Sequence, residues 1–121
     1  MPKHVLIVDD SKTMRDMAAF TLKGAGFSVM EAEDGQKALA LLRSTTIDLA
    51  ITDLNMPNMD GVTLIRNMRA DPRHRGVPIL MLTTESDPAK KADGRNAGAT
   101  GWIVKPFAPD KLVEVARKVC P

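Results

Sequence analysis

The chain has 121 residues, of which 44% are hydrophobic and 26% are charged, and its formal net charge is +2. This length suits one domain, and the composition excludes the disordered and fibrous classes of protein. The lysines and arginines are dispersed, and the aromatic residues are three phenylalanines and one tryptophan, so we expect no nucleic-acid partner.

The single cysteine, Cys120, excludes an internal disulfide and a cysteine-based metal cluster. It favours a reducing compartment. The apolar run at Val5–Val8 is interrupted at once by Asp9 and Asp10, so we expect neither a signal peptide nor a membrane span. We therefore expect a cytoplasmic protein without a membrane partner.

Five short apolar runs predict β-strands at residues 4–8, 27–30, 47–52, 77–83 and 100–104. Four of the runs are nearly continuous in apolar character, which is typical of parallel strands covered on both faces. The run at 27–30 alternates between apolar and polar residues and is the weakest. We therefore place it at an edge of the sheet.

Apolar residues at helical spacing lie between and after these runs and predict five helices, at residues 14–25, 38–42, 62–68, 88–97 and 112–119. Gly24 or Gly26 is the signal that ends the first helix. The helix at 88–97 is expected to be the least secure and the most easily moved. Its apolar members are alanines, and Gly94 inside it costs about 1 kcal/mol relative to alanine.

Strands that alternate with helices predict an α/β fold with a parallel sheet, right-handed crossovers and helices on both faces. In such a sheet the ligand site lies outside the carboxyl ends of the strands. Polar residues stand at four of these strand ends, namely Asp9 and Asp10, Asp53, Thr83 and Thr84, and Lys105 before Pro106. Each set alone could be a helix cap or a turn, but four sets at one edge indicate a site.

The chemistry of this set is coherent. Three carboxylates brought together repel one another unless a cation neutralises them, and an all-oxygen site suits Mg²⁺. Asp53 can act as a nucleophile toward a phosphoryl group, with Asp9 and Asp10 around the metal. Thr83 and Lys105 can then stabilise charge on the transferred oxygens.

The chain resembles the receiver domains of response regulators in its Asp9-Asp10-Ser motif, its Asp53–Gly61 stretch, its Thr83-Thr84 pair and its Lys105-Pro106-Phe107 motif. The resemblance covers the whole chain and implies one receiver domain over residues 1–121. It implies a flavodoxin-like (βα)5 fold with the sheet order 2-1-3-4-5. It also implies a signalling protein rather than an enzyme, although one that catalyses its own phosphorylation and dephosphorylation.

By this resemblance, Asp53 would accept a phosphoryl group from a histidine kinase. Asp10, Asp53 and the main-chain carbonyl of Asn55 would bind Mg²⁺, with Asp9 helping through water. The Lys105-Pro106 bond is typically cis in this family, which orients the lysine.

Thr83 and Trp102 would form the switch pair of the family. The threonine hydroxyl would move toward the phosphoryl group while the aromatic ring turns inward. Trp102 stands where tyrosine or phenylalanine is usual, and its alternative role is simply to cover the weak fourth helix.

Asn55 and Glu85 match residues that tune phosphoryl hydrolysis in single-domain, CheY-like chemotaxis regulators, and the stretch 100–107 is also similar to these proteins. Both could instead be ordinary polar residues of surface loops. The chain stops after its fifth helix, so we expect its output to be docking. Nothing in the sequence demands more than a monomer, which is the state we expect. The resemblance implies docking through the fourth helix, fifth strand and fifth helix, with the flagellar motor switch as the partner.

Three alternatives remain open. The protein could be a phosphate sink or relay intermediate that binds no motor, or a receiver cut from a hybrid kinase, against which Met1 argues. The third is a metal-dependent phosphatase with an aspartyl nucleophile. Such enzymes usually carry an Asp-x-Asp motif after their first strand, whereas Asp53 follows the third.

Overall fold

The computed structural model describes residues 2–83 and 88–121. Its strands are β1 (His4–Val8), β2 (Ser28–Ala32), β3 (Leu49–Asp53), β4 (Ile79–Thr83) and β5 (Gly101–Val104). Its helices are α1 (Lys12–Gly24), α2 (Gly35–Leu42), α3 (Gly61–Ala70), α4 (Pro88–Ala97) and α5 (Pro109–Val119). Strands and helices alternate along the chain, as the apolar runs predicted.

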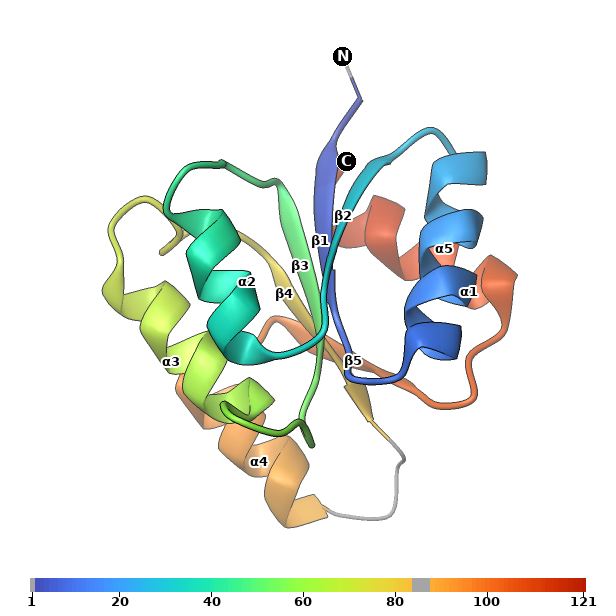
Figure 1. The fold of residues 1–121 in the computed structure, drawn as a ribbon. Coiled ribbons are helices and arrows are strands. Elements are labelled where there is room, and N and C mark those ends of the chain that lie inside the picture. The colour runs from blue at the N-terminus through green and yellow to red at the C-terminus, as the bar shows by residue number, and fades with distance from the viewer. Residues whose placement is uncertain (1, 84–87) are drawn as a thin grey trace.

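The strands form one parallel sheet in the order β2-β1-β3-β4-β5 (Figure 1). This confirms the flavodoxin-like α/β fold and places the weakest predicted strand, β2, at an edge. The chain reverses direction across the sheet after β2, so β1 and β3 are neighbours. Their carboxyl ends flank the crevice where ligands bind in sheets of this kind.

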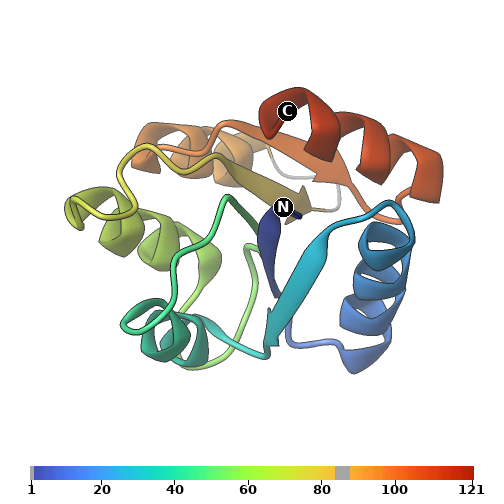
Figure 2. The same ribbon diagram turned by 90° about the horizontal axis from the view of Figure 1, so that it is seen from above.

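Helices cover both faces of the sheet. Figure 2 shows α1 and α5 on one face and α2, α3 and α4 on the other. Residues of β1 alternate between the two cores: Val5 and Ile7 pack with residues of α1 and α5, while Leu6 and Val8 pack with residues of α2 and α3. This two-sided burial explains why β1 is apolar at successive positions.

The strand bounds differ slightly from those expected. β2 runs on to Ala32, because Ala32 pairs with Val8 of β1. β4 begins only at Ile79, since Pro78 has no N–H to contribute to the sheet. Helix α1 ends at Gly24, and Gly26 then adopts a φ of +97°, a backbone angle that glycine takes without strain.

The last two helices of the chain, α4 and α5, differ in how they pack. Helix α5 buries Leu112 and Ala116, whereas the only buried residue of α4 is Gly94. The absence of a side chain at Gly94 lets α4 approach the core closely, because a Cβ there would lie 1.9 Å from the Sδ atom of Met81. No helix within residues 2–83 and 88–121 is long and apolar enough to cross a membrane.

Candidate functional site

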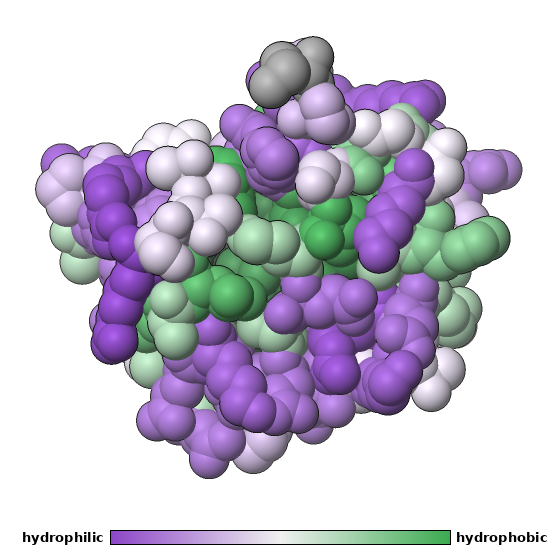
Figure 3. Space-filling view, turned by 45° about the horizontal axis from the view of Figure 1, so that its top comes forward, coloured by the Kyte–Doolittle hydropathy of each residue, from purple (hydrophilic) through white to green (hydrophobic). Residues whose placement is uncertain are grey.

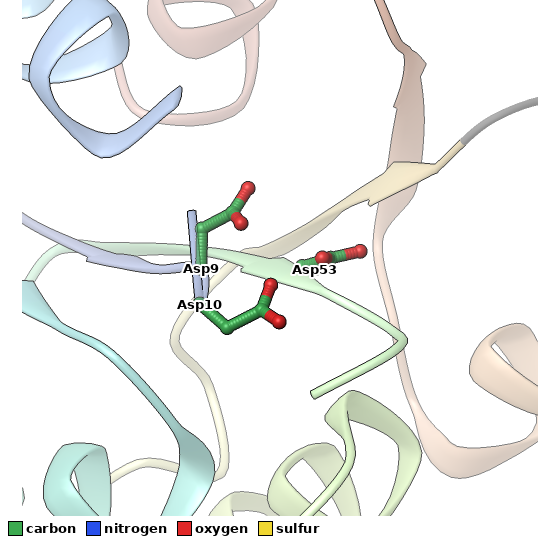
Figure 4. A group of neighbouring side chains, drawn as sticks. All are labelled: Asp9, Asp10 and Asp53. Atoms are coloured by element: carbon green, nitrogen blue, oxygen red, sulfur yellow. The ribbon is translucent and has the colours of Figure 1, made fainter. Parts of the chain in front are cut away.

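Three carboxylates meet at the carboxyl ends of β1 and β3. Asp9 and Asp10 follow β1, and Asp53 is the last residue of β3, which lies beside β1 in the sheet. One carboxylate oxygen from each residue lies within 4.8 Å of the others. Figure 4 shows the three side chains pointing to the same side of the strand ends. The sequence prediction that these residues converge is confirmed.

Asp9 is completely buried and its polar atoms are held from several directions. Its main-chain N–H donates to the Ala32 carbonyl at 3.1 Å, which continues the pairing of β1 with β2. Its Oδ1 accepts from the Ser11 N–H at 2.9 Å, and its Oδ2 accepts from the Lys105 ammonium at 2.8 Å. The position of this carboxylate is therefore fixed by the loop after β1, through Ser11, and by the loop after β5, through Lys105.

Asp53 is also buried, with 8% of its surface exposed. The Leu54 N–H donates to its Oδ1 at 2.8 Å, and the Lys105 Nζ lies 3.3 Å from its Oδ2. Burial raises the pKa of Asp53 above its usual range, the Lys105 charge opposes that rise, and the negative charge of Asp9 adds to it. A second cation at the site would favour the ionised form of Asp53.

Lys105 reaches the carboxylates from the end of β5. Burial acts to lower the pKa of Lys105, but the hydrogen bond to Asp9 and the charge of Asp53 outweigh it, so the pKa is raised. The ammonium group therefore stays charged beside the two aspartates. Its main-chain N–H donates to the Thr83 carbonyl at 2.8 Å, and the Lys105-Pro106 bond is cis, as the family resemblance implied.

Helix α3 begins very close to the main chain of Asp53 and Leu54. A Cβ on Gly61 would lie 2.2 Å from the Asp53 carbonyl oxygen and 2.9 Å from the Leu54 Cα. Only glycine fits here, because both neighbours are main-chain atoms that cannot turn away. Asp60 caps the same helix by accepting from the Thr63 N–H at 2.8 Å.

The loop between β3 and α3 is tied to α2. Asp34 is 3% exposed and caps α2 by accepting from the Lys37 N–H at 2.9 Å. Its other oxygen accepts from the Asn58 side chain at 2.9 Å, and Asn58 has a left-handed φ of 68°. The hydrogen bond to Lys37 and then that to Asn58 lower the pKa of Asp34. The carboxylate therefore holds the loop that carries Asn55.

The remaining predicted residues lie at or near this edge. Thr83 is buried at the end of β4. Asn55 is exposed, and its side-chain oxygen accepts a hydrogen bond from the Lys90 ammonium of α4. Thr84 and Glu85, predicted as part of a motif and as a tuning residue, lie outside the described residues.

Trp102 lies on β5, away from the carboxylates, with 38% of its surface exposed. The Lys91 ammonium is 5.3 Å from its ring centroid and the Arg95 guanidinium is 4.9 Å away. Both cations belong to α4, so in this structure the ring covers the fourth helix. The sequence analysis gave this role as the alternative to the switch pair, and the switch role of Thr83 and Trp102 stays a prediction.

The donor set fits a hard divalent cation. It offers carboxylate oxygens from Asp9, Asp10 and Asp53, with Asp10 exposed to solvent, and such oxygens are the ligands that Mg²⁺ takes. Lys105 pairs with Asp9 and Asp53 but not with Asp10, so negative charge at the cluster is left for a cation to neutralise. The residues of this edge therefore suit the metal that the sequence predicted.

Two cationic residues at this edge were missed from the sequence. Lys90 contacts Asn55, and Arg15 donates to the main-chain carbonyl of Asp9 at 2.7 Å. Neither belongs to a motif at a strand end. The only signal for Arg15 is its position in the first turns of the helix that follows Asp10, on a chain segment that must pass the site.

The fold and the acidic, lysine-bearing site together define a receiver-type protein. The sequence matches the response regulator receiver domain over residues 5–117, and the chain belongs to this family. Members of the family are signalling proteins rather than classical enzymes.

Individual relatives agree with this assignment. The chain is 41% identical over 116 residues to the chemotaxis protein CheY of Pseudomonas aeruginosa, covering 95% of this chain and 94% of that protein. It is 40% identical to the chemotaxis protein CheY-3 of Vibrio cholerae, covering 95% and 89%. The solved structure of the chemotaxis response regulator CheY4 of Vibrio cholerae superposes with a TM-score of 0.94 at 44% identity, covering 98% and 99% of the two chains.

Proposed function

We propose that this chain is a phosphorylation-switched protein of a two-component system that accepts a phosphoryl group on Asp53 from a histidine kinase, with Mg²⁺ as cofactor. The observation that carries the proposal is the Asp53 carboxylate, buried between Lys105 and two further aspartates at the carboxyl edge of the sheet. Residues 1–121 would act as one receiver domain, monomeric and cytoplasmic.

The side chains divide the work of phosphoryl transfer. Asp9, Asp10, Asp53 and the main-chain carbonyl of Asn55 would hold Mg²⁺, which when bound neutralises charge on the phosphoryl oxygens. An oxygen of Asp53 attacks phosphorus as the phosphorus–nitrogen bond of the phosphohistidine breaks, and the electron pair leaves with the imidazole. The Leu54 N–H orients the Asp53 carboxylate, and Lys105 places a positive charge beside it.

The signal would leave through α4, β5 and α5. The Lys105 main-chain N–H donates to the Thr83 carbonyl, which connects the site to the ends of β4 and β5. Trp102 and Val104 of β5 are 38% and 40% exposed. A groove of about 340 Å³ lies along this side, lined by residues of β5 and of the start of α5. Because the relatives are chemotaxis proteins, we propose the flagellar motor switch as the docking partner, with Asn55 and Glu85 setting the lifetime of the phosphoryl group.

Incubation with acetyl phosphate and Mg²⁺, followed by intact mass measurement, tests the proposal. We expect the mass of one phosphoryl group on the parent protein. Asp53→Asn should show no gain, and a chelator should abolish the gain in the parent. Full modification of Asp53→Asn would show that the acceptor is another residue.

Two further measurements separate the alternatives. A phosphate sink or relay intermediate would return its phosphoryl group to a histidine phosphotransfer protein and would bind the motor switch no better after phosphorylation. A phosphatase would turn over a small phosphoester many times per molecule. Single, stoichiometric modification without such turnover supports the receiver.

A further inference from the structure

The main-chain carbonyl of Asp9 has an unusual partner. It lies at the buried end of β1 and accepts a hydrogen bond from the Arg15 Nη1 at 2.7 Å. Arg15 is in the second turn of α1, and its side chain is 14% exposed. A guanidinium thus contacts the main chain of the acidic cluster, whereas Lys105 contacts the Asp9 side chain.

We propose that Arg15 is a positioning residue for the metal site, which fixes the Asp9-Asp10 peptide and thereby sets the affinity for Mg²⁺. The inference rests on the proposed function. The Asp9 carbonyl and the Asp10 nitrogen belong to one rigid peptide plane. Holding the carbonyl therefore fixes the point from which Asp10, the exposed ligand of the cluster, leaves the strand.

Glu31 holds the other edge of the guanidinium. The Arg15 Nε lies 3.6 Å from the Glu31 Oε1, and Glu31 is on β2, next to Ala32, whose carbonyl accepts from the Asp9 N–H. Arg15 therefore connects α1, the end of β1 and the edge strand β2. The planar, forked guanidinium can serve two partners at once, whereas a lysine ammonium at the end of its stem cannot reproduce this geometry.

The Arg15–Glu31 pair borders a groove of about 540 Å³ between α1, β2 and α2. Lys37 and Glu33, which pair with each other, line the same groove. Figure 3, a view of one face of the molecule, shows hydrophobic surface across its middle with hydrophilic side chains around it. The Glu31 side chain is 33% exposed, so Glu31 can be changed without opening the core.

A positioning role and a purely electrostatic role for Arg15 predict opposite effects of its removal on Mg²⁺ binding. A guanidinium near three carboxylates repels an incoming divalent cation, so if only charge mattered, removing Arg15 would tighten Mg²⁺ binding. If Arg15 acts by fixing the peptide, its removal weakens binding although a repulsive charge is lost. Arg15→Lys keeps the charge and removes the fork, which isolates the positioning effect.

Calorimetric titration of the whole protein with Mg²⁺ tests the inference. We expect Arg15→Lys and Arg15→Ala to raise the Kd for Mg²⁺ by about threefold to tenfold at unchanged stoichiometry. Glu31→Gln should raise the Kd less, and its effect should not add to that of Arg15→Lys, because the two residues act as a unit. Lys23→Gln is the matched control: it removes an exposed cation from the last turn of α1, at the other end of the helix from Asp10, and it should leave the Kd unchanged.

The outcomes are distinguishable. Parental affinity in Arg15→Lys, or tighter binding in Arg15→Ala, would overturn the positioning role while leaving the proposed function intact. Absence of Mg²⁺ binding by the parent would overturn both. Thermal unfolding without metal identifies the folded variants, and if Arg15→Lys does not fold, an unchanged Kd in Glu31→Gln overturns the role. A general loss of structure would lower the stoichiometry, whereas the positioning role changes the Kd.

Discussion

The two sides of the sheet's carboxyl edge are built differently. On the β1–β3 side, Asp9 and Asp53 are buried and their carboxylates accept hydrogen bonds from main-chain N–H groups and from Lys105. On the β4–β5 side, α4 buries only Gly94, and Trp102 and Val104 are partly exposed. The chemistry thus sits on the firmly held side, and the side proposed for docking packs loosely.

A small domain can in this way combine a fixed site with a movable surface. Phosphoryl transfer needs carboxylates held in place before the donor arrives. A switch needs an element whose two arrangements differ little in free energy, and a helix with few buried apolar contacts meets that need. Lys105 joins the two sides, because it leaves the end of β5 and contacts both Asp9 and Asp53.

The largest effect should come from Gly61→Ala on the firmly held side. The new Cβ would collide with the Asp53 carbonyl at 2.2 Å, and main-chain atoms cannot move aside cheaply. We expect a loss of about 2–3 kcal/mol in the free energy of unfolding and weaker Mg²⁺ binding. Urea unfolding and Mg²⁺ titration check this, and parental values for both would show that the α3 packing is not fixed.

A smaller effect should come from Gly94→Ala in α4. Alanine gains about 1 kcal/mol of helix propensity over glycine, but its Cβ would lie 1.9 Å from the Met81 Sδ in the core. We expect a net loss of about 1 kcal/mol in urea unfolding, since the collision outweighs the propensity.

The matched control for Gly94→Ala is Gly24→Ala, at the end of α1, where no atom lies within 4 Å of the new Cβ. It should stabilise the protein by about 0.5–1 kcal/mol. If Gly94→Ala stabilises as much as Gly24→Ala, then α4 does not lie against Met81, and this helix is held even more loosely than the structure shows.

The pH dependence of Asp34→Asn tests whether the Asp34 carboxylate connects α2 to the β3–α3 loop. The pKa of Asp34 in the folded protein lies below its ordinary value of 3.8, so its carboxylate stabilises the fold above about pH 4. That contribution is lost as the pH falls through the folded-state pKa. We expect Asp34→Asn to be less stable than the parent at pH 7 in urea unfolding, with a difference that shrinks at pH 3. An equal difference at both pH values would contradict the role of the charge.

The smallest effect should come from the cations beside Trp102. An exposed cation–π contact contributes about 0.5–1 kcal/mol. Arg95→Gln should therefore change stability little but alter the Trp102 emission spectrum, since the guanidinium lies 4.9 Å from the ring centroid. Arg43→Gln, an exposed arginine at the end of α2, is the control. Identical spectra for Arg95→Gln and the parent would place the ring outside the influence of α4.

The sequence predicted much of this fold because strand and helix periods are local signals. Asp9, Asp10 and Asp53 could be placed together because parallel strands end at the same edge of a sheet. The contact of Arg15 with the Asp9 carbonyl could not be predicted, since it depends on a side-chain direction within α1. The Asp34–Asn58 hydrogen bond joins residues 24 positions apart, and no periodic pattern encodes it.

Amide hydrogen exchange with and without Mg²⁺ and beryllofluoride, a stable mimic of the phosphoryl group, tests the account most directly. We predict that exchange in β1 and β3 stays slow in both states, while exchange in α4 and β5 changes when the mimic binds Asp53. Asp53→Asn should show no change. A change confined to α1 and α2, or none anywhere despite bound beryllofluoride, would contradict the claim that the site is fixed and its signal leaves through α4 and β5.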